Sequence, residues 1–588
     1  MCIRDRGSSQ SRPGLRSPRA VWADAPVADS GLVAKLTSAL KLPETVCSVL
    51  AIRGISDVSE AKHFLRPHLD HLQDSSALFD GPRAAERIAD AIKTGERILV
   101  HGDYDVDGVC ATALLTRWLR SFGGNVTPFV PHRLRDGYDF SSAGVKAATE
   151  AGAKLIVTAD CGTVAHGAIA AAQTRGIDVV VTDHHTVGPE LPNAFAFVNP
   201  QRAECSYPEK GLCGTGVAYK LCELVGEQLG GGLQKLHRYL DLVALATVAD
   251  LVPLIGENRT FVHYGLRRLA DTQVPGLKAL LRSSGVGDRE ITAGQVGFKL
   301  APRINAAGRI GDSADALRLL LTDDLSEAVQ LATELEDINR RRQAEDQRTL
   351  NEALETLVAQ YDPDSDFGVV LSGDDWHPGV IGIVASRVVE RIHRPVVMIA
   401  FDGESGRGSA RSIHGFHVYE ALQQCREYLG RFGGHQQAAG LDIDRAFLPA
   451  FREAFNRVAR ERLQRDALRP AFRPDLLLEL SEVDLDDLAH WLGYLGPHGI
   501  GNSSPLFLAR GVSLEQAKLV GEKHLKGMLR KEEVLLDVIG FGFAERHPPH
   551  LVRAEPYDVL FRLERNEWKG RIRPQARLID MKPAESGS

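Results

Sequence analysis

Short apolar runs alternate with longer amphipathic stretches from about Arg97 onward. Four runs have the length and the Val/Ile/Leu content of strands, and they span 97–101, 126–130, 155–159 and 178–182. Helical patterns occur at 109–119, after the first run, and at 165–172, after the third. Strands that alternate with helices favour βαβ units, so the pattern predicts a parallel sheet. From Tyr219 to Leu320 the pattern is mainly helical.

The rest of the chain divides into a connector, a second α/β unit and a β module. The segment 325–360 is polar and has no Gly or Pro, which favours one long helix between two lobes. Beyond it, the pattern predicts strands at 367–371 and 396–400 and helices at 379–390 and 419–428. Apolar and polar residues then alternate from about Leu506 to Met581, which predicts a small antiparallel β module.

Composition and charge limit the classes of protein to which the chain can belong. With 588 residues it is too long for one hydrophobic core, and 44% hydrophobic and 25% charged residues are ordinary for a soluble globular protein. A net charge of −7 excludes a uniformly basic nucleic-acid coat, so contacts with a polyanion must come from local patches. No apolar run approaches the ~18 residues of a membrane span.

The eight cysteines include no C-x-x-C pair. In a chain of this length they are interpreted as reduced, mostly buried thiols, which indicates a cytoplasmic protein. A structural zinc site through Cys205, Cys213 and Cys222 is the alternative, and their spacing disfavours it because it lacks close ligand pairs. Residues 1–20 are rich in Arg, Ser, Gly and Pro and have no apolar core, so they are predicted to be a disordered or non-native leader.

Acidic and His residues gather where the predicted strands end. The segment His101-Gly-Asp103-Tyr-Asp105-Val-Asp107-Gly follows the first strand, Asp160 follows the third, and Asp183-His184-His185 follows the fourth. In an open parallel sheet, ligands bind at the carboxyl ends of the strands, so these side chains are predicted to meet in one crevice. The carboxylates would repel one another there unless cations neutralised them.

The ligand types predict the metal and the chemistry. Carboxylates with one or two imidazoles and no thiolate suit Mn²⁺ or Mg²⁺. Several shared carboxylates favour two ions about 3.5–4 Å apart, an arrangement that activates water for attack at phosphorus. The apolar stretch 239–250 ends in Asp250, which is either one more ligand or only a helix-capping residue. The sequence therefore predicts a metal-dependent phosphoesterase.

Seven segments, in this order, resemble the DHH phosphoesterase superfamily and, within it, the RecJ-type single-strand-specific DNA exonucleases. The resemblance extends over roughly residues 22–580. It rests on segments 101–108, 158–162, 183–185, 246–250, 302–309, 376–382 and 433–440, which read HGDYDVDG, TADCG, DHH, ATVAD, PRINAAGR, WHPGVIG and GGHQQAAG.

The resemblance implies roles for individual residues. It implies metal ligands at Asp105, Asp107, Asp160, His184 and Asp250, and it places His101 and His185 either among the metal ligands or beside the phosphate. It implies catalytic roles for Asp105, Asp107, His184 and His185. Asp103 and Asp183 either join the ligands or orient the loop or a ligand. Substrate contacts are implied for Arg303, Asn305, Arg309, His377, Ser409, Arg411, Gly433, Gly434 and His435. Glycines allow close approach of a phosphate and Arg offers it a planar fork, so these residue types suit that role.

The resemblance also implies the architecture. The expected fold class is α/β, with a parallel-sheet DHH domain joined by a long helix to a second α/β lobe, and a C-terminal OB-like β-barrel. The expected domains are 21–324 for the N-terminal segment and DHH domain, 325–360 for the connecting helix, 361–466 for the DHH-associated substrate-gripping domain, and 467–588 for a linker, the OB-like domain and a short tail. Residues 506–582 contain 15 Lys and Arg against 11 Asp and Glu, and a net charge of +4 suits binding of a single strand.

The expected function is that of a Mn²⁺- or Mg²⁺-dependent exonuclease that degrades single-stranded DNA from the 5′ end in DNA repair and recombination. The direction and the DNA preference come from the resemblance. One alternative is a phosphodiesterase for oligoribonucleotides or cyclic dinucleotides, against which the β module argues. Another is a non-catalytic, replication-associated binding protein, against which the intact set of acids and histidines argues. A cytoplasmic monomer without membrane contact is expected, with a helicase and a single-strand-binding protein as candidate partners.

Overall fold

The computed structural model describes residues 18–133, 135–137, 139–287, 290–521, 523–543, 555–568 and 570–584. Residues 1–17, most of the predicted leader, lie outside the described residues. The described chain forms two compact units. The first consists of Asp57–Arg340 and Gly493–Ser504, and the second consists of the other described residues.

A five-stranded parallel sheet lies at the centre of the first unit. Its strand order is β3-β2-β4-β5-β6. The strands are β2 (Arg97–Gly102), β3 (Asn125–Phe129), β4 (Leu155–Ala159), β5 (Asp178–Thr182) and β6 (Ala196–Val198). The four predicted strands correspond to β2 to β5, and β6 was not predicted. The carboxyl ends of β2, β4 and β5 therefore meet at one edge of the sheet.

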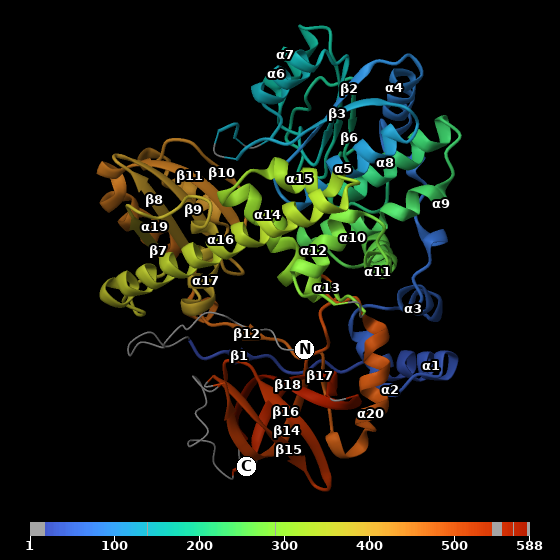
Figure 1. The fold of residues 1–588 in the computed structure, drawn as a ribbon. Coiled ribbons are helices and arrows are strands. Elements are labelled where there is room, and N and C mark those ends of the chain that lie inside the picture. Colours follow the sequence, from blue (N-terminus) through green and yellow to red (C-terminus); the bar gives the residue numbers. More distant parts are fainter. Residues whose placement is uncertain are drawn as a thin grey trace. The chain divides into compact units, whose positions relative to one another are not determined.

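Helices cover both faces of this sheet. One face packs on α4 (Gly81–Lys93), α5 (Val106–Arg120) and α8 (Gly214–Gln228), and the other packs on α6 (Ser142–Ala151) and α7 (His166–Gln173). Figure 1 shows α6 and α7 together on one side. Neighbouring residues of β2 point into opposite cores, Ile98 and Val100 into one and Leu99 into the other. Burial on both faces explains why the strands are continuous apolar runs rather than alternating ones.

The rest of the first unit is helical. It contains α3 (Val58–Leu65), α9 (Leu233–Leu236), α10 (Leu240–Ala249), α11 (Gly256–Ala270), α12 (Pro275–Ser283), α13 (Ala293–Gln295), α14 (Ala301–Ile310) and α15 (Ser313–Leu321). Between α13 and α14 lies a π-helical stretch, η4 (Val296–Leu300). The 36-residue helix α16 (Leu325–Gln360) begins in this unit and continues into the second one, and its bounds equal those predicted for the connector.

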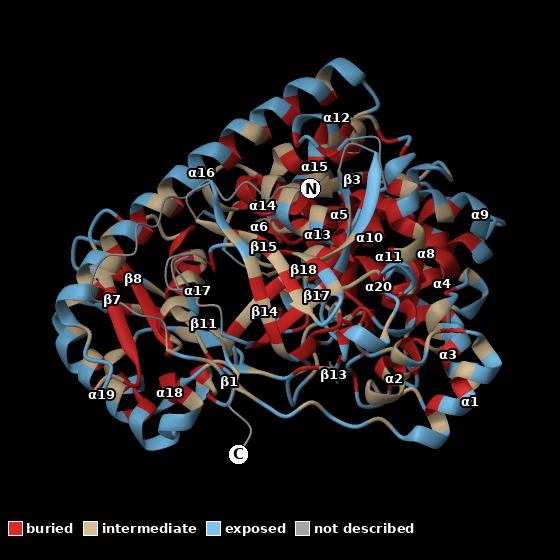
Figure 2. Ribbon diagram, turned by 90° about the horizontal axis from the view of Figure 1, so that it is seen from below, coloured by how far each residue is buried: buried red, intermediate tan, exposed pale blue. Residues whose placement is uncertain are grey.

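The second unit contains a mixed five-stranded sheet. Its order is β10-β11-β9-β8-β7, and only β7 and β8 are parallel. The strands are β7 (Val369–Gly373), β8 (Val396–Asp402), β9 (Ser405–Arg411), β10 (Phe432–Gly434) and β11 (Ala438–Asp444). One face packs on α16 and α17 (Ile381–Ile392), the other on α18 (Val418–Gln424) and α19 (Leu448–Arg462). Figure 2 shows β7 and β8 as buried strands.

A closed five-stranded barrel forms the C-terminal part of the second unit. The strands are β14 (Phe507–Val520), β15 (His524–Lys531), β16 (Val534–Gly540), β17 (Tyr557–Trp568) and β18 (Arg571–Pro583). Pairing of β14 with β17 closes the barrel. Of the pairings among these five strands, only that of β16 with β18 is parallel, and the others are antiparallel. The short strand β13 (Leu476–Leu477) pairs in parallel with the start of β14, and the unpredicted α20 (Leu485–Leu492) packs on β17 and β18. The predicted α/β fold class with an OB-like barrel is confirmed.

The N-terminal segment belongs to this second unit. It contains β1 (Val21–Trp22), α1 (Ser30–Leu40) and α2 (Glu44–Ile52), and β1 pairs in parallel with β12 (Ala471–Phe472). The Trp22 indole N–H donates to Asp580 at 2.9 Å, and Arg53 forms an ion pair with Asp475 at 3.0 Å. Within the described part of the chain, the helices are either too short or too polar to cross a bilayer.

Candidate metal centre

The loop between β2 and α5 holds three aspartates in a tight turn. Asp105 is the N-cap of α5, and its carboxylate accepts hydrogen bonds from Asp107 N at 2.9 Å and Gly108 N at 3.1 Å. This satisfies amide groups that the first turn of a helix leaves without partners. A side chain at Gly108 would overlap the backbone of Asp103, so glycine permits the fold of the loop. The spacing of the predicted motif therefore has a local structural reason.

The N-terminus of α8 holds the carboxylate of Asp107. Gly214 N donates to Asp107 Oδ2 at 2.6 Å and Thr215 N donates to Oδ1 at 2.7 Å. The Thr215 hydroxyl also donates to the Asp107 carbonyl at 2.9 Å. A helix N-terminus stabilises a carboxylate through its free amides and its dipole. The sequence analysis missed Gly214 and Thr215, and the Gly-Thr-Gly run after Cys213 is the signal that could have found them.

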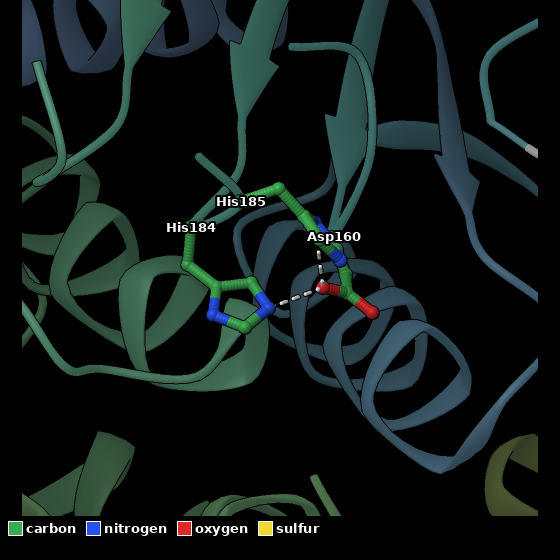
Figure 3. Close-up of side chains that lie close together, drawn as sticks. All are labelled: Asp160, His184 and His185. Atoms are coloured by element: carbon green, nitrogen blue, oxygen red, sulfur yellow. Dashed lines mark ion pairs between the residues drawn. The ribbon is translucent and has the colours of Figure 1, made fainter. Parts of the chain in front are cut away.

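His184 lies among carboxylates from three other segments. Its Nε2 is 3.1 Å from Asp160 Oδ1, 3.6 Å from Asp250 Oδ2 and 3.8 Å from Asp107 Oδ2. His185 Nδ1 is 3.9 Å from the same Asp160 oxygen, and Figure 3 shows the ion pairs of both histidines ending on that oxygen. Burial lowers the pKa of His184, which favours the neutral imidazole that metals bind.

Asp183 orients the two histidines. Its Oδ1 accepts hydrogen bonds from His184 N at 2.7 Å and from the His185 ring at 2.7 Å, and its Oδ2 accepts one from Thr163 N at 2.9 Å. Burial opposes its ionisation, yet the hydrogen bond and charge of His185 lower the pKa of Asp183 to about 2. Burial likewise opposes a charge on His185, but Asp183 raises its pKa to about 9. Of the two roles open to Asp183, the geometry favours orientation.

Asp250 lies at the C-terminal end of α10 and in contact with the cluster. Burial, reinforced by the charges of Asp107 and Asp105, raises its pKa to about 9. Its Oδ2 lies 3.6 Å from His184 Nε2, a contact that a capping role alone does not require. Its predicted role as a ligand, rather than only a cap, fits this position.

Three overlapping groups of these side chains have the spacing of metal ligands. The groups are Asp107 with His184 and Asp250, Asp160 with His184 and His185, and Asp103 with Asp105 and Asp160. Asp160 and His184 each belong to two groups, so neighbouring ions could share them.

The donor atoms fit divalent cations. Asp160 Oδ1, His184 Nε2 and Asp103 Oδ1 are buried and have no hydrogen-bond partner. Burial and neighbouring carboxylates raise the pKa of Asp160 and of Asp103 well above the usual range. A bound cation would give these buried atoms a partner, and its charge would favour the ionised form of the carboxylates. Oxygen and imidazole donors without thiolate suit Mn²⁺ or Mg²⁺.

His101 lies beside the cluster but belongs to none of these three groups of described residues. Its ring packs between Phe129, at 5.2 Å, and Phe140, at 5.1 Å, and its Nδ1 lies 3.5 Å from Cys161 Sγ. Burial lowers its pKa to about 4. Its role as a metal ligand stays a prediction. The seven described cysteines are all buried and free, as expected.

The segment 302–309 contacts the metal-site loop. Asn305 Oδ1 accepts a hydrogen bond from Val106 N, the first amide of α5, at 3.2 Å. A side chain at Gly308 would come within 2.6 Å of the Tyr104 carbonyl oxygen. Arg303 is mostly buried and pairs with Glu336 of α16 at 2.5 Å. Arg309 lies close enough to Tyr104 to influence its ionisation. Their predicted contacts with substrate are untested, and Asn305 has a clear structural contact.

The second unit brings together part of its predicted substrate set. The Arg411 guanidinium donates to Ser409 Oγ at 2.9 Å on β9, and both side chains lie against Gly382 in the first turn of α17. His377 accepts a hydrogen bond from Gly379 N at 3.0 Å just before that helix.

The glycine-rich segment forms a hairpin in the same sheet. Gly433 and Gly434 lie on β10, which pairs with β11, and exposed His435 follows them. Gly434 has φ 145°, and a side chain there would overlap Ala439, so the position requires glycine.

Two further residues of the first unit support the centre without a motif. Asp139 accepts a hydrogen bond at 2.6 Å from the backbone N–H of Gly162, which is two residues after Asp160. Asn199 donates to Thr163 Oγ1 at 3.1 Å and to the His185 carbonyl at 3.0 Å. No spacing in the sequence indicates either of them.

A parallel sheet whose strand ends gather buried aspartates and histidines defines a metal-dependent phosphoesterase. Family models agree with this class: the DHH family N-terminal domain matches residues 97–247, the DHHA1 domain matches 365–461, and the RecJ OB domain matches 474–580. The chain belongs to the RecJ family of the DHH superfamily, so the predicted resemblance is confirmed.

Named relatives and solved structures support this membership. The chain is 36% identical to the single-stranded-DNA-specific exonuclease RecJ of Bacillus subtilis, over 95% of this chain and 70% of that protein. It is 37% identical to the RecJ of Escherichia coli K12, over 90% of this chain and 94% of that protein. The crystal structure of Thermus thermophilus RecJ with Mn²⁺ has a TM-score of 0.83 and 33% identity, and the match covers 97% of this chain and 80% of that one. The same protein has also been solved with Mg²⁺.

Proposed function

We propose that this protein is a Mn²⁺- or Mg²⁺-dependent exonuclease that degrades single-stranded DNA in the 5′-to-3′ direction by two-metal phosphodiester hydrolysis. The observation that carries the proposal is the cluster of buried aspartates and histidines around Asp160 and His184. The names of its relatives support the substrate. The direction, and a role in DNA repair and recombination, rest on the family resemblance.

Two of the three groups of side chains would each hold one ion. Asp107, His184 and Asp250 would bind one, and Asp103, Asp105 and Asp160 would bind the other. When bound, divalent ions supply Lewis acidity toward the phosphate and acidify the attacking water. The α8 amides hold the Asp107 carboxylate in place through two hydrogen bonds. That fixed position avoids reorganisation during the reaction.

His185 would contribute an oriented imidazole beside the metal centre. Burial opposes a charge on this ring, and its hydrogen bond and ion pair with Asp183 raise its pKa. A polar group that is fixed in place beside the scissile phosphate stabilises the negative charge that develops in the transition state. Asp183 keeps the ring oriented through its 2.7 Å hydrogen bond to Nδ1.

The second unit would bind the strand. Arg411 and Ser409 form a polar pair beside the first turn of α17, and such a guanidinium suits a phosphate oxygen. The barrel, with its excess of Lys and Arg, would track the backbone of the single strand. The proposal includes the domain division that the sequence predicts. It also includes a cytoplasmic monomer, with a helicase and a single-strand-binding protein as partners.

The test uses the full chain, Mn²⁺ and strands labelled at the 5′ or the 3′ end, single or paired. We expect stepwise loss of mononucleotides from the 5′ end of the single strand. Asp107→Ala should abolish cleavage, whereas Ala in place of exposed Asp323, which pairs with Arg117 at the surface, should not change it. No degradation, preferred attack on the duplex, or an active Asp107→Ala variant would overturn the proposal. Faster turnover of a dinucleotide than of a long strand would favour the oligonucleotide phosphodiesterase instead.

A further inference from the structure

Leu251 is a strained and exposed apolar residue directly after the candidate ligand Asp250. Its φ is 60°, in the left-handed region, which is a genuine outlier for a bulky side chain. Its side chain is 68% exposed. Strain of this kind concentrates at functional sites, where the surrounding structure maintains it. Solubility and packing give no reason for a leucine here, because it is neither buried nor relaxed.

Phe298 is a second exposed apolar side chain near the end of α10. It is 77% exposed, more than any other aromatic side chain that the structure describes. It lies in η4, and π-helical turns occur frequently at functional sites. The neighbouring Gly297 contacts α10, since a Cβ built there would lie 3.8 Å from Val248 Cγ1. Val248 is two residues before Asp250, so η4 packs beside the last turn that leads to the metal centre.

We propose that Leu251 and Phe298 form an apolar contact surface for the nucleobase next to the scissile phosphodiester. This inference rests on the proposed function, because the cluster then binds the phosphate and the base of the same nucleotide must lie nearby. Aromatic and aliphatic side chains bind the faces of bases without sequence preference, as an exonuclease requires. Two side chains are too small a surface for a stable protein partner, which typically buries about 800 Å² on each side.

The same surface would contribute to single-strand selectivity. Both faces of a base inside a duplex are covered by its neighbours, and separating them costs a few kcal/mol, on the order of the unstacking energy of one step. A base at the end of a single strand offers a face at lower cost. Leu251 and Phe298 therefore favour a strand whose bases are already unstacked.

The experiment compares two substrates and five proteins. One substrate is an ordinary single strand, and the other carries abasic residues at the attacked end. The proteins are wild type, Phe298→Ala, Phe298→Trp, Leu251→Asn and the control Phe447→Ala. Phe447 is 44% exposed and lies in the second unit, remote in sequence from the metal centre. Mn²⁺-dependent cleavage is measured as kcat/KM.

On the ordinary strand, Phe298→Ala should lower kcat/KM by roughly 10- to 100-fold, the value of one stacked base. On the abasic strand, wild type and Phe298→Ala should be equal, because there is no base to contact. Phe298→Trp keeps a stacking face and should retain activity, and Phe447→Ala should match wild type on both substrates. Leu251→Asn should behave like Phe298→Ala, and Asn tolerates a positive φ, so the loop keeps its conformation.

Three outcomes overturn the inference. They are an equal loss on both substrates, no loss on either, and a Phe298→Trp variant as impaired as Phe298→Ala. An inactive wild type on the ordinary strand would instead overturn the proposed exonuclease function. Adding Mn²⁺ should raise the Tm of Phe298→Ala as much as that of wild type, because Phe298 is not a metal ligand.

Discussion

Replacing Gly214 with alanine is a sharp test of how the metal centre is built. Gly214 begins α8, and its amide holds the Asp107 carboxylate at 2.6 Å. An alanine Cβ there would lie 2.5 Å from Asp160 Cβ, 2.6 Å from Oδ1 and 2.8 Å from Cγ. Either Asp160 moves away, or the start of α8 moves and takes its hydrogen bond to Asp107 with it. Both movements displace a predicted ligand.

The size of the effect follows from these distances. Non-bonded carbon atoms rest about 3.5–4.0 Å apart, so relief of the overlap needs a shift of roughly 1 Å. Misplacement by 1 Å at a reacting centre lowers the rate about 100-fold. We therefore expect Gly214→Ala to lose at least roughly this factor in kcat/KM and to bind Mn²⁺ more weakly.

Gly216→Ala is the matched control on the same helix. Its Cβ would lie 3.4 Å from Leu212 Cβ and 3.8 Å from Cys213 Sγ, which is ordinary packing. Both substitutions replace helical Gly with Ala, which by itself stabilises a helix by about 0.5–1 kcal/mol. Cleavage of labelled single-stranded DNA and Mn²⁺ titration calorimetry are measured for both variants. If Gly214→Ala were as active as Gly216→Ala, the close packing of Gly214 against Asp160 would not be needed to position the ligands.

Three further predictions concern other parts of the first unit. Burial raises the pKa of Asp241 to about 6. Between about pH 4 and 6 the Asp241 carboxyl is therefore protonated in the folded chain but ionised in the unfolded chain, so the free energy of unfolding falls as pH rises through that window. Asp241→Asn should remove up to about 3 kcal/mol of this pH dependence in urea unfolding, and an unchanged profile would contradict it. Asn305→Ala leaves Val106 N without its partner and should lower the free energy of unfolding by about 1–3 kcal/mol, whereas exposed Asn351→Ala should not. Chelation by EDTA should abolish cleavage, and Mn²⁺ should restore it and raise the Tm of the wild type, since a ligand of the native state stabilises it.

The strand-end chemistry was predictable because it follows from one rule of parallel sheets. Asp107, Asp160 and His184 lie beyond β2, β4 and β5, and any such arrangement brings them to one edge. The partners of Asp107 were not predictable by the same means. Gly214 is 107 residues away in sequence, and only the packing of α8 against the sheet places its amide beside that carboxylate.

Residues with the same position relative to a strand can have different roles, and spacing does not separate them. Asp103 and Asp183 each follow a strand, yet Asp103 Oδ1 is buried without a hydrogen-bond partner, whereas Asp183 accepts hydrogen bonds from both histidines and Thr163. The strand β9 was missed for a different reason. Its Gly- and Ser-rich sequence has a low strand propensity, and it is a strand because β8 and β11 pair with it on both sides.

Hydrogen bonds within the protein hold several residues of the centre in position. Asp105 caps its own helix, Asp107 is held by α8, and Asp183 is held by Thr163. Hydrogen bonds of this kind oppose the repulsion among buried carboxylates, which would otherwise spread the loop. Other atoms that could bind a metal, such as Asp160 Oδ1, have no hydrogen-bond partner, so the hydrogen-bonded atoms position the ligands and the others suit a cation. Removal of metal should therefore abolish catalysis while leaving the fold of the first unit in place, because the loop's own hydrogen bonds do not involve the ion.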